Sequence, residues 1–118
     1  MATSTVKQSE PYEYGSNNNG EYYKFKEGLL ICIKSVVGEI VVESPWGNLY
    51  EGSLDLGNWP YSFTGTPYAS VTNAGGGGGM IEAVNYTSAT SCGTVWIVRP
   101  NTNTQTNGFR IVGIGRWK

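Results

Sequence analysis

Gly108-Phe-Arg-Ile-Val-Gly-Ile-Gly-Arg-Trp-Lys118 is the clearest strand in the chain, and the expected fold is built around it. Side chains alternate between the two faces of an extended backbone, and in this stretch both faces carry bulky groups. We therefore predict a central strand of a sheet, covered on both faces from Ile111 to Ile114. Gly113 and Gly115 have no side chain, so an aromatic ring or another backbone can approach closely there.

The composition predicts one compact domain. A chain of 118 residues that is 39% hydrophobic and 13% aromatic can build a single core. The formal net charge of -1, with only 14% charged residues, gives no basic surface for nucleic acid or an anionic membrane. The sequence contains neither an apolar run long enough to cross a membrane nor a charged-then-apolar leader, so we expect no membrane insertion and no targeting signal.

The rest of the chain predicts short strands separated by turns. Residues 1–18 show no strand or helix period, so we expect a flexible lead-in or linker, followed by one β domain over residues 19–118. Glu27-Gly28 can form the tight turn of a hairpin between two strands. The hairpin strands and the others are expected over residues 21–26, 29–37, 39–43, 49–56 with a bulge at Gly52, 61–64, 67–72, 80–86 and 93–99.

Two stretches are expected to be loops, residues 73–79 and 100–107. The run Gly75 to Gly79 predicts a mobile loop, because ordering consecutive glycines costs the most backbone entropy. With about eight strands and no helical period, the pattern favours an all-β fold, a single antiparallel β-sandwich or barrel-like domain.

The residue types exclude several kinds of catalytic site. The chain has no histidine, which rules out Ser-His-Asp and Cys-His arrangements. Cys32 and Cys92 are expected to be small buried hydrophobes, although a disulfide between neighbouring strands stays open. The glycine run has no following Lys-Ser/Thr and therefore does not predict a phosphate site. We expect no enzyme, no metal site and no cofactor.

Aromatic side chains are the strongest candidates for binding. Flat rings stack on sugar rings, and neighbouring amides bind sugar hydroxyls. The predicted ligand-binding residues are Trp46, Asn58, Trp59, Tyr61 and Tyr68. Trp59 lies in a Gly-Asn-Trp-Pro turn, where it can either face a ligand or fill the core, and both interpretations stay open.

Four segments resemble a known family: Asn19-Gly-Glu-Tyr-Tyr-Lys-Phe-Lys-Glu-Gly-Leu-Leu-Ile-Cys32, Pro45-Trp-Gly-Asn-Leu-Tyr50, Leu56-Gly-Asn-Trp-Pro60 and Ile114-Gly-Arg-Trp-Lys118. They look like the C-terminal domain of tail-fibre and minor structural proteins from tailed bacteriophages and prophages of Gram-positive bacteria. In that family a similar hairpin opens the domain, usually with Asp where this chain has Glu27, and Ile-Gly-Arg-Trp-Lys often ends the protein.

The resemblance implies a structural virion module at the distal end of a tail fibre, made in the host cytoplasm, attached to the rest of the fibre or baseplate and assembled as a homotrimer. Its expected partner is a bacterial surface receptor, a saccharide above all. Burying apolar strand faces between chains would also stabilise a small domain with 17 glycines and little charge.

Two alternatives to receptor binding remain. One is a purely structural module that caps and trimerises the fibre without a ligand of its own. The other is a glycan-hydrolysing tip, which needs two carboxylates at catalytic separation in a groove. Within the closing segment, we expect Trp117 to pack in its own core or against a neighbouring chain, and Arg116 and Lys118 to be surface or interface charges.

Overall fold

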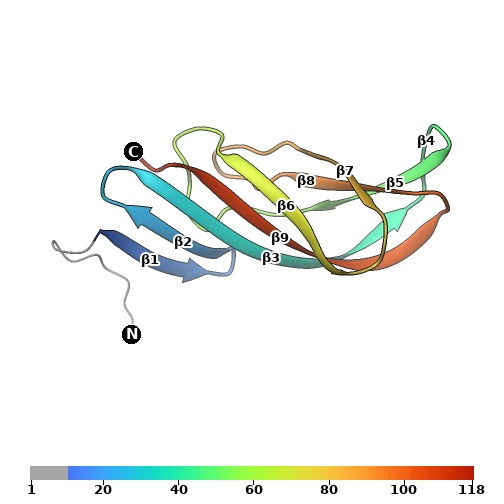
Figure 1. Cartoon of the computed structure of the whole chain (residues 1–118), viewed down its shortest axis with the longest axis horizontal. Coiled ribbons are helices and arrows are strands. Elements are labelled where there is room, and N and C mark those ends of the chain that lie inside the picture. Colours follow the sequence, from blue (N-terminus) through green and yellow to red (C-terminus); the bar gives the residue numbers. More distant parts are fainter. Residues whose placement is uncertain (1–10) are drawn as a thin grey trace.

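The computed structural model describes residues 11–118, which form nine strands and no helix. The strands are β1 (Tyr12–Asn17), β2 (Gly20–Phe25), β3 (Leu29–Val42), β4 (Ser44–Trp46), β5 (Leu49–Asp55), β6 (Tyr68–Gly76), β7 (Met80–Asn85), β8 (Thr94–Arg99) and β9 (Asn103–Arg116). All pairings are antiparallel, in a five-stranded sheet A with the order β1-β2-β3-β9-β6 and a four-stranded sheet B with the order β4-β5-β8-β7 (Figure 1). The all-β prediction is confirmed. In the described part of the chain, no helix could cross a membrane.

The two sheets stack on each other along one half of β3, in a sandwich-like arrangement. Gly52 of β5 makes the close approach possible, because a Cβ at this position would lie 2.5 Å from the Val41 carbonyl oxygen of β3. The predicted bulge at Gly52 is wrong, since this residue pairs regularly with Ile97 of β8. The predicted break at Gly38 is also wrong. β3 runs through it, and a Cβ there would meet the Leu54 side chain at 2.6 Å.

β9 is an internal strand, as predicted, with β3 on one side and β6 on the other. Its predicted coverage on both faces is wrong. Phe109 and Ile111 are buried on the inner face, whereas Val112 and Ile114 on the outer face are 37% and 43% exposed. The physical reason is that sheet B and the loop described next cover the inner face, whereas no described element lies over the outer face of sheet A.

Two glycines of β9 receive aromatic rings from residues 56–67, the loop between β5 and β6. A Cβ at Gly113 would lie 2.6 Å from the Trp59 ring, and one at Gly115 would lie 2.8 Å from the Phe63 ring. The two rings meet edge to face with their centroids 5.4 Å apart. The predicted close approach is confirmed. The strand predicted over residues 61–64 is wrong, because this segment is a loop that docks its rings on the sheet.

The start of the domain differs from the expected boundary. Residues 12–17 form β1 and pair with β2, although they lie inside the predicted lead-in. Only residues 1–10 of that lead-in lie outside the described part of the chain. Tyr12 and Tyr14 supply the strand signal, because they alternate along β1 and contact the rings of Phe25 and Tyr23.

The glycine run carries the chain from sheet A to sheet B and is tied to β9. Gly76 is the last residue of β6. The Gln105 amide donates to the Gly78 carbonyl (2.6 Å), and the Asn107 amide donates to the Gly77 carbonyl (3.0 Å). The loop predicted over residues 100–107 is therefore wrong from Asn103 onward, where β9 starts. The reason is that the amides of Gln105 and Asn107 face inward and bind the glycine backbone.

Gly113→Ala should destabilise the protein by about 1–3 kcal/mol, because the added methyl overlaps the Trp59 ring. Gly108→Ala is the matched control on the same strand. Its Cβ would meet the nearest atom, of Val37, at 3.7 Å, an ordinary contact. This variant should be neutral or more stable by up to about 1 kcal/mol. Urea unfolding of both variants checks the difference, and equal stability would contradict the proposed ring contact.

Candidate functional site

The structure does not bring the five predicted ligand-binding residues together. Trp46 lies on β4, at the end of the molecule opposite the C-terminus (Figure 1). Asn58, Trp59 and Tyr61 belong to the loop 56–67, and Tyr68 starts β6. The molecule is elongated, with principal extents of 56 × 28 × 15 Å, so Trp46 cannot share one small site with the loop residues.

Trp59 is part of the core. Its side chain is only 4% exposed, its ring packs on Gly113, and its indole N–H donates to the Ser88 carbonyl (3.1 Å). The structure therefore supports the core interpretation of Trp59 over the ligand-facing one. Asn58 is exposed, but its backbone carbonyl accepts a hydrogen bond from the Lys34 ammonium (2.8 Å), and no aromatic ring is placed beside it.

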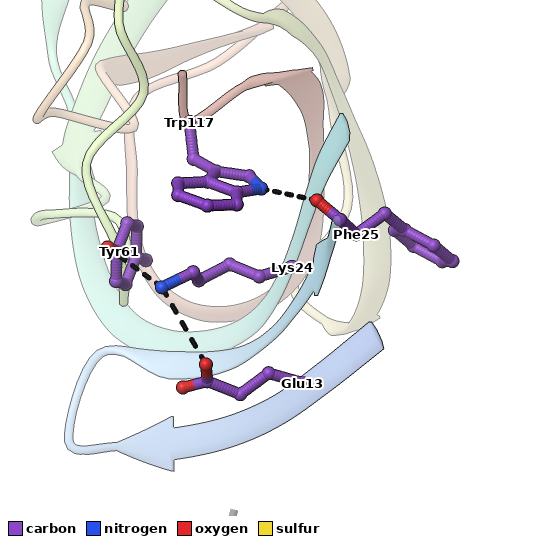
Figure 2. A network of polar contacts seen from close by, with 5 residues as sticks. All are labelled: Glu13, Lys24, Phe25, Tyr61 and Trp117. Atoms are coloured by element: carbon purple, nitrogen blue, oxygen red, sulfur yellow. Dashed lines mark hydrogen bonds and ion pairs between the residues drawn. The ribbon is translucent and has the colours of Figure 1, made fainter. Parts of the chain in front are cut away.

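Tyr61 belongs to a cluster that closes the C-terminal end of the domain (Figure 2). The Lys24 ammonium lies 4.5 Å from the ring centroids of both Tyr61 and Trp117. It donates to the Tyr61 hydroxyl (3.1 Å) and pairs with the Glu13 carboxylate (3.7 Å). The Trp117 indole N–H donates to the Phe25 carbonyl (2.7 Å). Trp117 therefore packs within its own chain.

The Lys24 cluster clamps the C-terminal residues to β2. Burial alone would lower the pKa of Lys24, but the hydrogen bond with Tyr61 and the charge of Glu13 outweigh it, and the pKa is raised. The amine is thus fully protonated at neutral pH, when a nucleophilic or basic lysine would need a lowered pKa. Its cation–π contacts join β2 to the C-terminal residues.

A hollow around Trp46 offers room for a small ligand. It has a volume of about 520 Å³, and its lining residues are Trp46, Leu49, Gly79, Met80, Ile81, Glu82, Val98, Arg99 and Pro100. We call it the Trp46 hollow. Trp46 and Met80 are 47% and 72% exposed, so an indole face and a thioether are both open to solvent. Such a mixture of apolar walls and a few polar groups is typical of ligand sites.

Charged groups surround the Trp46 hollow. Glu51 pairs with Val98 across the sheet and lies beside Glu82. Partial loss of hydration, the charge of Glu82 and a hydrogen bond with it raise the pKa of Glu51. Arg99 donates from Nη1 to the Gln105 side chain (3.0 Å), whereas its buried Nε has no hydrogen-bond partner among the described residues.

Among the described residues, Glu82 is the one carboxylate in the lining of the Trp46 hollow. A glycosidase needs two carboxylates, about 5–9.5 Å apart with the scissile bond between them. The oxygens of Glu82 can accept hydrogen bonds from the hydroxyl groups of a ligand in the hollow.

A second surface lies on the outer face of sheet A. Tyr14, Tyr23, Ile31, Ile114 and Tyr68 are direct cross-strand neighbours and form one row over all five strands. Neighbouring positions add Tyr12, Phe25, Leu29, Ile33 and Val112. We call these ten residues the outer apolar face. In four strands, β1, β2, β3 and β9, apolar residues two positions apart indicate this outer face. An exposed face was not predicted, because we expected β9 to be covered on both sides.

The aromatic rings of the outer apolar face are not arranged as a flat platform. Ring centroids of Tyr12, Tyr14, Tyr23 and Phe25 lie 5.2–5.8 Å apart, with interplanar angles of 38° to 57°. Stacking on a planar sugar chain requires rings that face the same way. This face therefore suits protein packing better than sugar stacking.

The cysteines offer no reactive thiol. Cys32 and Cys92 are free and fully buried. Burial raises the pKa of Cys32 to about 12 and that of Cys92 to about 11, so both stay protonated at neutral pH. Among residues 11–118, no three His, Cys, Asp or Glu side chains stand together as metal ligands would.

No protein-family model matches the chain, and neither a curated protein nor a solved structure matches it. The resemblance to phage tail-fibre domains therefore rests on the sequence motifs alone.

The buried thiols should make the protein less stable in alkali. In the unfolded chain a thiol ionises near its ordinary pKa, whereas in the folded protein it keeps its proton until about pH 11–12. Their stabilising contribution is fully present below pH 9 and is lost as pH rises, by up to about 1.4 kcal/mol per pH unit for each thiol. Urea unfolding between pH 8 and 10.5 measures this slope, which should be shallower in Cys32→Ala. An unchanged slope would contradict the assignment.

Proposed function

We propose that this protein is the receptor-binding tip domain of a phage tail fibre and attaches the virion to a saccharide on the bacterial surface. The observation that carries the proposal is the position of the Trp46 hollow at the end of the elongated domain opposite the C-terminus (Figure 1). A fibre joined at the C-terminal end, where β1 also starts, would present this hollow outward.

The lining of the Trp46 hollow suits a sugar. An indole face stacks on the C–H groups of a pyranose ring, and Met80 adds a soft apolar wall. The carboxylate oxygens of Glu82 accept hydrogen bonds from sugar hydroxyl groups. The volume of about 520 Å³ fits a contact with one or two units of a polymer.

Self-association as a homotrimer belongs to the same proposal. Six residues of the outer apolar face are exposed side by side, and a contiguous exposed apolar patch is typical of a protein–protein interface: Tyr12, Tyr14, Leu29, Tyr68, Val112 and Ile114. Three copies would also present three Trp46 hollows, and binding of a repetitive glycan at several sites converts weak contacts into firm attachment.

A purely structural capping and trimerisation module is the second candidate, and the outer apolar face is the observation in its favour. The two candidates differ in one respect, namely whether the Trp46 hollow binds a ligand. The hydrolytic alternative is less well supported, because the described lining of the Trp46 hollow contains one carboxylate, Glu82, whereas a glycosidase needs two.

Trp46→Ala should reduce binding to purified Gram-positive cell walls by about tenfold, because it removes the stacking face without disturbing the core. Tyr86→Ala is the control, since Tyr86 is an exposed aromatic residue, 74% against 47% for Trp46, that lies outside the lining of the hollow. Pull-down of both variants and of the wild type on a panel of cell-wall saccharides makes the measurement. Wild-type binding that Trp46→Ala leaves unchanged would overturn the site. Absence of wild-type binding across the panel would favour the purely structural module.

The purified protein should have about three times the chain mass of 12.8 kDa in solution. Light scattering coupled to size exclusion measures the mass directly. A monomer at all accessible concentrations would overturn the proposed assembly. It would not bear on the saccharide site, which the Trp46→Ala pull-down tests.

A further inference from the structure

We infer that two different halves of the outer apolar face bind each other in neighbouring copies of this chain. The inference rests on the proposed self-association and goes beyond it by naming the interface. The acidic half comprises β1 and β2 with Glu21, and the basic half comprises β9 and β6 with Arg110 and Arg116.

Apolar contact supplies the attraction. The row Tyr14, Tyr23, Ile31, Ile114 and Tyr68 reaches from one edge of sheet A to the other. Tyr68, at the edge, is 86% exposed and is the most open of the large apolar side chains described. Covering this row removes water from side chains of both halves at once, which stabilises an assembly by about 25 cal/mol per Å² of apolar area.

The charges of Glu21 and Arg110 determine which half of the outer apolar face binds which. Glu21 accepts a hydrogen bond from the Tyr14 hydroxyl (2.8 Å), and it takes no part in the ion pair between Lys24 and Glu13. Arg110 is exposed on the opposite half. Glu21 and Arg110 line the same hollow of about 540 Å³, and the ion pair between Lys24 and Glu13 involves neither of them.

Opposite charges on the two halves favour heterologous packing. If two copies met through the same half, Glu21 would face Glu21 or Arg110 would face Arg110, and like charges in an interface are unfavourable. When the acidic half of one copy meets the basic half of the next, each contact joins unlike charges. Repetition of such a contact closes a ring when the rotation allows it, as in a trimer.

The occupant of this face is a second copy and not a saccharide. Neighbouring aromatic rings of the acidic half are tilted against one another by 38° to 57°, so they do not form the flat platform that sugar stacking requires. The formal charge of the chain is only -1, so copies do not repel one another strongly.

A charge swap tests the interface. Glu21→Arg alone and Arg110→Glu alone should each shift the oligomer toward monomer by at least about tenfold in dissociation constant, because each places like charges in the contact. The double variant, Glu21→Arg with Arg110→Glu, should restore association, since unlike charges face each other again. Analytical ultracentrifugation over a concentration series gives the constants.

Glu43→Arg is the matched control, with the same charge reversal outside the outer apolar face, and it should associate like the wild type. Circular dichroism confirms that each variant is folded. If single variants stay associated, or if the double variant does not recover, the inferred interface is wrong even though the protein assembles. A monomeric wild type would overturn the proposed assembly itself, so the two failures are distinguishable.

Discussion

The pairing of β3 with β9 along all 14 residues of each strand places every other part of the molecule. A ladder of this length has more inner face than sheet B can cover. Sheet B packs on one half of it, with Gly52 against Val41, and the rings of Trp59 and Phe63 close the other half. The inner face thus becomes a continuous core. The outer face remains uncovered because no further described segment reaches it.

Local signals predicted the strands well wherever alternation was clear. The closing strand, the hairpin at Gly28 and the ring contacts at Gly113 and Gly115 follow from sequence because each depends on residues close together or on a missing side chain. Whether one or both faces of sheet A are covered cannot be predicted from local sequence, because this depends on how many layers of structure the whole chain forms. Gln105 and Asn107 were taken for loop residues for a related reason: their inward amides become acceptable only when the glycine carbonyls are placed beside them.

The candidate site was predicted less well than the fold. Trp46 was among the expected residues, but its neighbours Met80 and Glu82 are distant in sequence. No local sequence pattern predicts that these residues lie together. Trp59, the most suggestive aromatic residue in the chain, fills the core. Trp59 and Trp117 belong to the segments that carry the phage resemblance, and both pack in this structure. These two motif residues therefore serve the fold, whereas the segment 45–50 of the same resemblance supplies Trp46 and Leu49 to the candidate hollow.

The position of the Lys24 clamp has a mechanical consequence. The C-terminus and the start of β3 lie at one end of the molecule, and the β4–β5 turn lies at the other (Figure 1). A pull between these two ends runs parallel to β3 and β9, so it loads their backbone hydrogen bonds together in shear. A pull that lifts the C-terminus away from the hairpin would instead open the ladder one bond at a time. Trp117, which is bound by the Phe25 carbonyl and the Lys24 ammonium, lies where such peeling would begin. The Lys24 cluster therefore resists peeling, the mode of unfolding under force to which the β3–β9 ladder is least resistant.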